Sequence, residues 1–304
     1  MLRLGIDLGG TKTEGVVIDA NGDVLRRERL ATPAADGYEA ILSNIEALVA
    51  DLETGCGRCH VGVGTPGAIS TRTGLLKNSN TTCLNGKPIL DDLQRRLARP
   101  IRVANDANCF ALAEALDGAG RDAAVVFGVI IGTGVGGGIV IRGQLLEGRQ
   151  HIAGEWGHNV LEPDGPPCYC GRRGCVETFL SGPGLVRDYQ LHGGASASDA
   201  LEVVRRAASG EASAQAALTR YLDRFGRALA TVINILDPDV VVLGGGLSNI
   251  EALYRDGPAR VASHLFAAHG GTHAEGMQTQ IRRNLHGDSG GVRGAALLWR
   301  DTMT

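Results

Sequence analysis

Apolar stretches that end at glycine-rich turns alternate along the chain with longer segments of helical periodicity. Buried runs and period-two alternation predict strands at 2–7, 15–19, 24–30, 60–64, 101–104, 123–131, 139–141, 240–243 and 278–285. Apolar residues spaced three and four apart predict helices at 37–53, 105–116, 201–208, 211–236 and 292–300. Strands interspersed with helices are typical of the α/β class, in which helices cover the faces of a sheet.

One unit of this pattern occurs twice. A strand, a glycine-rich turn and a second strand occupy 2–19 and again 123–141. Backbone N–H groups and a threonine hydroxyl in such a turn can bind a phosphate group, although an ordinary glycine hairpin has the same sequence. The second turn, GTGVGGG at 132–138, contains the spacing G-x-G-x-x-G but leads into a strand, so it does not fit the dinucleotide fingerprint. The repeat favours two related domains that grip one nucleotide.

The composition narrows the possible classes of function. The chain has 304 residues, which suggests two domains of ordinary size. The net charge of −3 gives no electrostatic basis for binding nucleic acid or an anionic membrane, and an aromatic share of 4% leaves few rings for stacking bases. The sequence has neither an export signal nor an apolar run long enough to span a membrane, so we expect a cytoplasmic protein with reduced thiols.

The segment GEWGHNVLEPDGPPCYCGRRGCVE at 154–177 has the composition of a metal site. It offers one imidazole and three thiols, from His158, Cys168, Cys170 and Cys175. Four nitrogen and sulfur ligands are what a structural zinc ion requires. The alternative is three unrelated buried cysteines and a surface histidine. Glu155 and Glu177 flank the ligands, which suggests that the segment does more than fold around a metal.

A second cysteine motif, CGRCH at 56–60, has the spacing of a haem c attachment site. Haem attachment requires export and a pocket for an axial ligand, and the sequence shows no export signal. We therefore expect a short loop with incidental thiols between a helix and a strand.

Polar groups follow several predicted strands. Asp7 ends the first strand beside a glycine turn, where a carboxylate can hold Mg²⁺ directly or through water. Asp106 begins a helix after the strand at 101–104, so it is either an N-cap or a general base at the carboxyl end of a strand. The polar side chains of the loop 74–88 are suited to binding the hydroxyls of a polyol. The alternative is an ordinary loop that is solvated by water. The three glycines at 244–246 leave room for an adenine or form a plain turn.

Together these features resemble the ROK family of sugar kinases, within the actin-like ATPase (ribonuclease H-like) fold. The matching motifs are IDLGGTKTE at 6–14, GTPG at 64–67, ANDANC at 104–109, IGTGVGGG at 131–138, GEWGH at 154–158, CYCGRRGCVE at 168–177, DPDVVVLGGG at 237–246 and GDSGGVRGAA at 287–296. The resemblance implies two similar α/β domains with a cleft between them, one formed by 1–117 with about 287–304 and the other by 118–286. The motifs look most like those of bacterial fructokinases with mannose activity, and N-acetylglucosamine kinases are near neighbours.

The resemblance implies ATP-dependent phosphorylation of the 6-hydroxyl of a hexose, with fructose or mannose first and N-acetylglucosamine as the alternative. Asp106 would accept the proton of the sugar hydroxyl as that oxygen attacks the γ-phosphate. The sugar would be bound by Gly67, Asn80, Asn105, Asp106, Glu155, His158 and Glu177. ATP would be bound by Asp7, Gly9, Gly10, Thr11, Lys12, Gly132, Thr133, Gly134, Gly136, Gly137, Gly244, Gly245 and Gly246.

The resemblance also implies metal ions and a homodimer. A structural zinc ion would be held by His158, Cys168, Cys170 and Cys175, and Asp7 would lie near the Mg²⁺ that accompanies ATP. The partners would be a hexose and ATP, without nucleic acid or membrane.

Two other functions are less consistent with the sequence. Sugar-responsive repressors of the same family carry a DNA-binding helix-turn-helix ahead of the first strand, and here that strand begins at residue 2. A sugar-binding protein without catalysis would lack Asp106 or the phosphate turns, and both are present.

Overall fold

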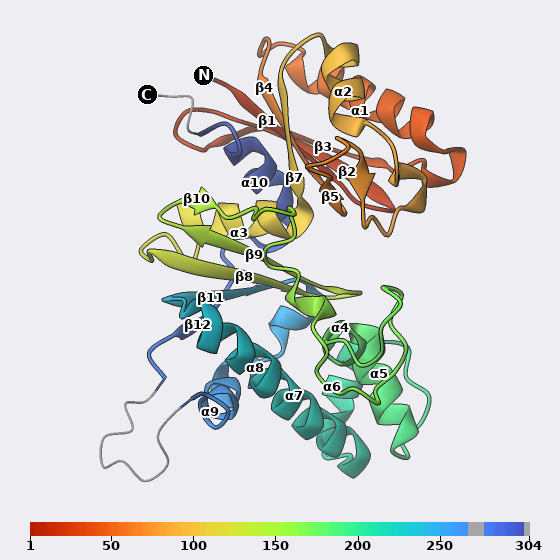
Figure 1. Cartoon of the computed structure of the whole chain (residues 1–304), viewed down its shortest axis with the longest axis vertical. Helices are drawn as coiled ribbons and strands as arrows, with labels where there is room; N and C mark the ends of the chain where they lie inside the picture. The colour runs from red at the N-terminus through yellow and green to blue at the C-terminus, as the bar shows by residue number, and fades with distance from the viewer. Residues whose placement is uncertain (267–276, 301–304) are drawn as a thin grey trace.

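The computed structural model describes residues 1–266 and 277–300 and contains two five-stranded sheets, one above the other along the long axis (Figure 1). The first sheet is formed by strands that precede residue 106, and the second by strands between 125 and 283. Each sheet packs on its own cluster of buried apolar side chains. These are the two similar α/β domains that the sequence predicts, and we call them the first domain and the second domain.

The two sheets share one topology. The first has the order β3-β2-β1-β4-β7 and the second β10-β9-β8-β11-β12. In each, three antiparallel strands are followed by two parallel ones. The strands are β1 (Arg3–Leu8), β2 (Lys12–Ile18), β3 (Val24–Ala31), β4 (His60–Thr65), β7 (Ile101–Asn105), β8 (Val125–Ile131), β9 (Val135–Ile141), β10 (Gln144–Leu145), β11 (Val240–Gly244) and β12 (Gln280–Arg283). The predicted duplication therefore extends to the whole sheet.

Helices α3 (Asp106–Leu116) and α10 (Gly290–Leu297) lie against each other between the two sheets (Figure 1). Helix α3 follows the first sheet but packs against the second, where a Cβ atom on Gly138 would lie 2.8 Å from a carbonyl oxygen of α3. Helix α10 follows the second sheet but packs against the first, where a Cβ atom on Gly5 would lie 2.0 Å from a carbonyl oxygen of α10. Glycine at these positions allows the two helices to approach the sheets closely.

The chain passes from the strands of the first sheet to those of the second by way of α3, and it returns to the first sheet by way of α10. We call residues 117–124, between α3 and β8, the first crossing, and residues 284–289, between β12 and α10, the second crossing. The domain boundaries expected at 117/118 and 286/287 stay predictions, and α3, which the first boundary assigns to the first domain, packs on the second sheet.

The remaining helices lie on the other faces of the sheets or, as α5, α6 and α9 do, pack against α7. They are α1 (Tyr38–Glu53), α2 (Ile89–Leu97), α4 (Glu177–Leu180), α5 (Gly182–Leu191), α6 (Ala200–Ala208), α7 (Ala212–Leu236), α8 (Ala252–Arg255) and α9 (Gly257–Ala262). Helix α7 buries Phe225 and Leu229 in the core of the second domain and ends where Asp237 adopts a left-handed conformation before a proline. Among the described residues, no helix combines the length and the apolar character that crossing a membrane requires.

The second strand of each repeat begins earlier than the sequence predicts, at Lys12 in β2 and at Val135 in β9. The second glycine turn therefore consists of 132–134 alone, and the three glycines at 136–138 lie in β9. A Cβ atom on Gly137 would lie 2.8 Å from the Trp156 ring, so close packing explains the glycine there. Tertiary contacts therefore keep these glycines in a strand, although glycine has a low intrinsic propensity for strands.

The sequence pattern did not predict several short elements. The polar loop 74–88 contains one strand of the hairpin β5 (Ala68–Ile69) and β6 (Leu76–Lys77), and α2, α4, α5, α8 and α9 were not predicted. The strand expected at 278–285 is only Gln280–Arg283, and the last helix begins at Gly290 instead of 292. Elements of a few residues carry too little periodicity to be recognised.

The CGRCH motif belongs to the structure of the first domain. Cys59 is only 4% exposed and joins the apolar core of that domain. His60 begins β4, and its ring lies 4.8 Å from that of Trp299 between centroids. The buried Cys59 differs from the incidental loop thiol that we expected, because the loop folds inward where β4 begins.

Candidate active site

A cavity of about 1010 Å³ lies between the two domains and brings together most of the residues singled out in the sequence. The first domain contributes Gly67, Asn80, Asn105 and Asp106. The second domain contributes Gly132, Thr133, Gly134, Gly136, Gly137, Glu155, His158 and Glu177. All the predicted sugar-binding residues and the second glycine turn therefore face one space, whose volume is at the upper end of the range for small-molecule sites.

Asp106 lies in the first turn of α3, directly after β7. The cap of this helix is Asn105, whose side-chain oxygen accepts hydrogen bonds from the N–H groups of Ala107 (2.9 Å) and Asn108 (3.3 Å). The Asn105 amide also donates to the Gly67 carbonyl at 3.2 Å. Asp106 is therefore not the N-cap. Its Oδ1 atom accepts a hydrogen bond from the Ala107 N–H at 2.8 Å, and its side chain lines the cavity.

Two carboxylates that line this space, and Asp7 outside its lining, have raised pKa values. Burial raises the pKa of Asp106. Burial also raises the pKa of Glu155, and the charge of Asp106 adds to that effect. At the end of β1, burial together with the charges of Asp106 and Glu14 raises the pKa of Asp7 to about 7. Such a concentration of negative charge favours hydroxyl donors and cations as ligands.

Glu177, at the start of α4, connects the cysteine segment with the second glycine turn. Its Oε2 atom accepts a hydrogen bond from the Val135 N–H at 2.9 Å, and a Cβ atom on Gly134 would lie 2.7 Å from the same oxygen. The Gly182 N–H donates to the Gly132 carbonyl at 2.7 Å, next to this contact. Sequence reasoning predicts Glu177 as a sugar ligand but missed its partner at the turn, which lies 42 residues earlier.

The four predicted metal ligands come together. The ligand atoms of His158, Cys168, Cys170 and Cys175 all lie within 4.8 Å of one another. The Nδ1 atom of His158 is 3.5 Å from the Cys168 sulfur, and the sulfurs of Cys170 and Cys175 are 3.6 Å apart. In a tetrahedral site with Zn–S bonds of about 2.3 Å, neighbouring ligand atoms are about 3.7 Å apart. Donor type and spacing therefore fit a four-coordinate zinc ion.

Helix α7 braces the cysteine segment from the side of the second domain. Arg224 donates from Nε to Glu162 at 2.9 Å, and Arg227 donates from Nη2 to the same carboxylate at 2.6 Å. The Arg224 guanidinium also lies over the Phe179 ring, 4.4 Å from its centroid. A Cβ atom on Gly174 would lie 1.5 Å from the Glu162 carbonyl oxygen, so only glycine fits at that turn. The ligand loop is thus fixed to a long helix.

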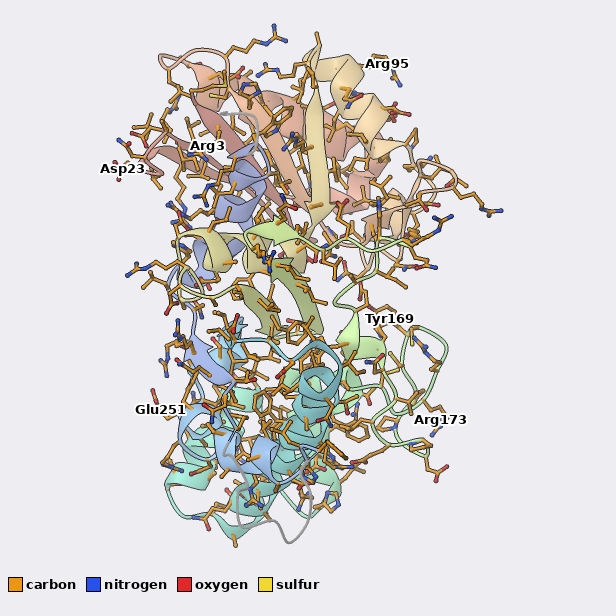
Figure 2. The ribbon with its side chains drawn as sticks, turned by 60° about the vertical axis from the view of Figure 1, so that its left-hand side comes forward. Arg3, Asp23, Arg95, Tyr169, Arg173 and Glu251 are labelled. Atoms are coloured by element: carbon orange, nitrogen blue, oxygen red, sulfur yellow. The ribbon has the colours of Figure 1, made fainter. Side chains whose placement is uncertain are left out.

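Tyr169 is a cavity residue that sequence reasoning missed. Its hydroxyl lies 3.0 Å from Nε2 of His158, the ring nitrogen not used toward Cys168, and the two rings meet edge to face. The side chain is 69% exposed and lies near the level where the two domains meet, whereas Arg173 lies further from the first domain (Figure 2). The signal that could have found Tyr169 is its place between two predicted metal ligands, Cys168 and Cys170, which holds it beside the Cys/His cluster.

Asp7 and the first glycine turn are not among the residues that line the cavity. The turn is closed by the Gly9 N–H, which donates to the Lys12 carbonyl at 2.9 Å, and Lys12 itself belongs to β2. Thr32 fixes the turn from β3's end, because its hydroxyl donates to the Gly9 carbonyl at 2.8 Å and its N–H donates to the Thr11 carbonyl at 3.0 Å. The role of Gly9, Gly10, Thr11 and Lys12 toward ATP stays a prediction.

The three glycines at 244–246 differ in their surroundings. A Cβ atom on Gly244 would lie 2.5 Å from the Phe110 ring, and Gly245 has a φ of +80°. Packing and backbone conformation explain these two. Only Gly246 has open space at its Cβ position, and its N–H lies next to Gly132 of the second turn. Of the three glycines predicted to bind adenosine, Gly246 therefore has the most open backbone, and its contact with a base stays a prediction.

Comparison with known proteins places this geometry in context. The sequence matches the model of the ROK family over residues 3–302. It is 39% identical over 305 residues to an N-acetyl-D-glucosamine kinase from Yersinia pseudotuberculosis, with 97% of each chain covered. The structure is similar to that of a ROK hexokinase from Thermus thermophilus, with a TM-score of 0.82 and 31% identity over 98% of this chain and 97% of that one. A ROK glucokinase from Streptomyces griseus, in complex with glucose and AMPPNP, gives a TM-score of 0.78 and 29% identity over 99% and 100% of the two chains.

Proposed function

The chain belongs to the ROK family, and from this premise we propose that it is an ATP-dependent kinase that phosphorylates the 6-hydroxyl of a hexose. The observation that carries the proposal is the position of Asp106. This carboxylate begins a helix that another residue caps, and it lines a cavity together with Glu155 and the second glycine turn. A general base, hydroxyl-binding acids and a phosphate-binding turn are the parts that phosphoryl transfer to a sugar needs.

Asp106 acts as the general base in this proposal. The sugar oxygen forms a bond to the γ-phosphorus of ATP as the bond from that phosphorus to the bridging oxygen breaks, and ADP leaves. The proton of the sugar hydroxyl passes to Asp106. Because the transition state of phosphoryl transfer is loose and the proton moves late, a carboxylate is a sufficient base. The raised pKa of Asp106 makes it a stronger base than an exposed aspartate.

Mg²⁺ bound with ATP would neutralise charge on the phosphates. Asp7 fits as a group that holds this ion, directly or through water. Burial and the neighbouring charges of Asp106 and Glu14 raise the pKa of Asp7 to about 7, so the positive charge of Arg29 compensates its ionised form only in part. A divalent cation supplies that charge.

As the preferred substrate we propose N-acetylglucosamine, ahead of fructose and mannose. The motifs alone place fructose first. However, the 39% identical relative is named as an N-acetyl-D-glucosamine kinase and is matched over 97% of its length. Discrimination at the 2-position of a sugar depends on a few pocket atoms, so both substrates belong in one experiment.

The test is a coupled assay of ADP release with N-acetylglucosamine, N-acetylmannosamine, glucose, mannose and fructose. We expect kcat/KM for N-acetylglucosamine to exceed that for fructose by about tenfold or more. A higher value for fructose would reverse the order of substrates. The absence of ADP release with every hexose would refute the kinase proposal, and phosphorus NMR of the product identifies the hydroxyl that is modified.

We further propose that His158, Cys168, Cys170 and Cys175 hold a structural zinc ion. Metal analysis should find about one zinc per chain. Cys168→Ser should lose the metal and raise the sugar KM about tenfold or more, because loss of the ion frees His158 and the neighbouring Glu155 and Glu177. Cys83→Ser is the matched control, since this thiol lies in the first domain against the Ala34 carbonyl. Well-folded protein without zinc would contradict the proposal.

A further inference from the structure

A second cavity, of about 620 Å³, lies next to the cavity that Asp106 lines, which we call the first cavity. All five residues of β7 line the second cavity, although successive residues of a strand point to opposite faces. Since β7 is the last strand of its sheet, the second cavity lies along the open edge of that strand. Both residues of β10, the last strand of the other sheet, line it as well. Its volume is within the range of small-molecule sites.

The second cavity is elongated and largely aliphatic. Asn108, Leu112 and Leu116 line it from one face of α3, and eight residues of a helix rise by about 12 Å. Along β7, the step from Arg102 to Asn105 covers about 10 Å. The other apolar side chains of the lining include Ile69, Leu90, Val103, Leu145 and Leu298. A ligand of matching shape is long, narrow and apolar in its middle.

One end of the second cavity offers a hydrogen-bond acceptor. Asn108 is only 7% exposed, and its Oδ1 atom is buried without a hydrogen-bond partner. The neighbouring Asn105 is already engaged, because it caps α3 and donates to the Gly67 carbonyl. A buried carbonyl oxygen without a partner is costly, so an O–H or N–H group of a ligand would stabilise this end, which we call the amide end.

Positive charge gathers at the other end, which we call the arginine end. Arg102, at the start of β7, donates to the Leu298 carbonyl, and its guanidinium lies over the Trp299 ring, 4.5 Å from the centroid. Arg300 lines the cavity two residues after Leu298. Within residues 1–266 and 277–300, neither arginine forms an ion pair with a carboxylate. Two guanidinium groups in this state favour an anionic ligand.

A carboxylate near the amide end fixes the orientation of such a ligand. Glu147 lines the second cavity, and its carbonyl accepts a hydrogen bond from the Ala153 N–H at 3.2 Å, next to Gly154 of the first cavity. Asn105, which lines both cavities, marks the same side. The charge of Glu147 disfavours an anion there, so the anionic group belongs at the arginine end.

We propose that the second cavity is a ligand site, separate from the site for sugar and ATP, that binds an elongated aliphatic acid with a hydroxyl group at the end opposite to its carboxylate. The carboxylate pairs with Arg102 and Arg300, the hydroxyl donates to Oδ1 of Asn108, and the carbon chain lies among the aliphatic side chains. The site does not depend on the proposed kinase activity.

The test uses 10-hydroxydecanoate as the probe and isothermal titration calorimetry of the full chain. We expect a Kd of about 1 mM or below. Decanoate leaves the Asn108 oxygen without a partner and should bind about threefold or more weakly. Decane-1,10-diol has no charge for the arginines and should bind about tenfold more weakly. No binding of the hydroxy acid up to about 10 mM, or equal affinities of the three probes, would overturn the proposal.

Variants assign the two ends. Arg300→Gln should weaken binding of the hydroxy acid about threefold or more and leave the affinity of the diol unchanged. Asn108→Leu removes the acceptor and should abolish the difference between 10-hydroxydecanoate and decanoate; if this variant does not fold, the same comparison in the wild type tests the bond. Arg255→Gln, which alters an exposed arginine paired with Asp256, is the control and should change no affinity. Equal losses for acid and diol in Arg300→Gln would contradict the assigned arginine end.

Methyl NMR and competition locate the probe. Resonances of Val103 and Leu116 should shift with 10-hydroxydecanoate, whereas those of Val232 and Ile235, which line the first cavity, should not. N-acetylglucosamine with AMPPNP should change the Kd of the probe by less than about twofold. Shifts at Val232 and Ile235 alone, or a Kd that rises in proportion to the sugar concentration, would place the probe in the first cavity and overturn the proposal. An enzyme that phosphorylates no hexose would refute the kinase function and leave this test intact.

Discussion

The carboxylates at the two ends of helix α3 have pKa values that are shifted in opposite directions. At the N-terminal end, Asp106 lines the cavity and burial raises its pKa. At the C-terminal end, burial opposes ionisation of Asp117 as well, but hydrogen bonds from His286 and Arg293 lower its pKa to about 2. Glu114, between them, has its hydrogen bonds filled by backbone N–H groups. One short helix therefore carries the proposed general base at one end, which we call the reactive end, and Glu114 with Asp117 at the other, which we call the holding end.

The difference teaches that the supply of partners, and not burial alone, decides what a buried acid does. The reactive end leaves negative charge without full compensation, which costs stability but keeps a base available. The holding end compensates its charge fully and contributes stability. Substitutions at the two ends should therefore separate activity from stability.

The largest effect is expected at the reactive end. Asp106→Asn should lower kcat by about 10³-fold or more, because the amide cannot accept the sugar proton. Stability should stay the same or increase, since the amide carries no charge to desolvate. The coupled assay and thermal unfolding measure the two quantities, with the exposed Asp23→Asn as the control. Turnover within tenfold of the wild type would remove Asp106 from the mechanism.

The next effect concerns Asp7. Its pKa is raised to about 7 in the folded protein, whereas in the unfolded chain it is about 3.9. The folded state therefore binds the proton more tightly, and its relative stability falls as the pH rises from about 4 to about 7. Asp7→Asn does not titrate and should be more stable than the wild type at pH 8 by on the order of 2 kcal/mol, with little difference at pH 4. Urea unfolding without ATP at both pH values measures this, and equal differences at the two values would contradict it.

The holding end should show the reverse dependence on pH. The pKa of Asp117 is lowered to about 2 in the folded protein, so its stabilisation is present above pH 4 and is lost as the pH falls toward about 2. Asp117→Asn should cost about 1–2 kcal/mol at pH 7, a figure reduced for the partial exposure of the side chain. If the variant lost as much stability at pH 3 as at pH 7, the contrast between the two ends of α3 would not hold.

The smallest effect is expected from a cavity residue on neither end of the helix. Tyr169→Phe removes the hydroxyl that lies 3.0 Å from Nε2 of His158. One hydrogen bond to an exposed side chain is worth about 0.5–1.5 kcal/mol, so the sugar KM should change by about threefold and kcat by less. A loss of kcat similar to that of Asp106→Asn would place a second essential group in the cavity.

Much of the fold and site could be predicted from local sequence. The long periodic helix at 211–236 and the apolar strands stand out because their period repeats many times. The Cys/His cluster is recognisable because its four residues lie within 18 positions, from His158 to Cys175. Asp106 is recognisable because a strand end and a helix start coincide there.

The rest depends on contacts between distant parts of the chain. Leu285 donates to Glu114 across 171 residues, and no periodicity reports such a pair. The sequence around the glycines at 136 and 137 predicts a turn. They lie in a strand because other parts of the chain, including Trp156, pack closely against them. The motif around Glu177 predicts a sugar ligand, but nothing in that motif predicts the hydrogen bond that Glu177 accepts from the Val135 N–H.

The exchanged helices also set the order in which this protein can be completed during synthesis. Residues 290–297 provide the surface that covers Gly5 and Gly62 in the first sheet, where Cβ atoms would lie 2.0 Å and 1.9 Å from helix carbonyl oxygens. The first domain emerges from the ribosome first, yet an uncovered apolar face remains on it until the end of the second domain has been made. The first domain of this chain therefore cannot complete its packing before the second domain has been translated.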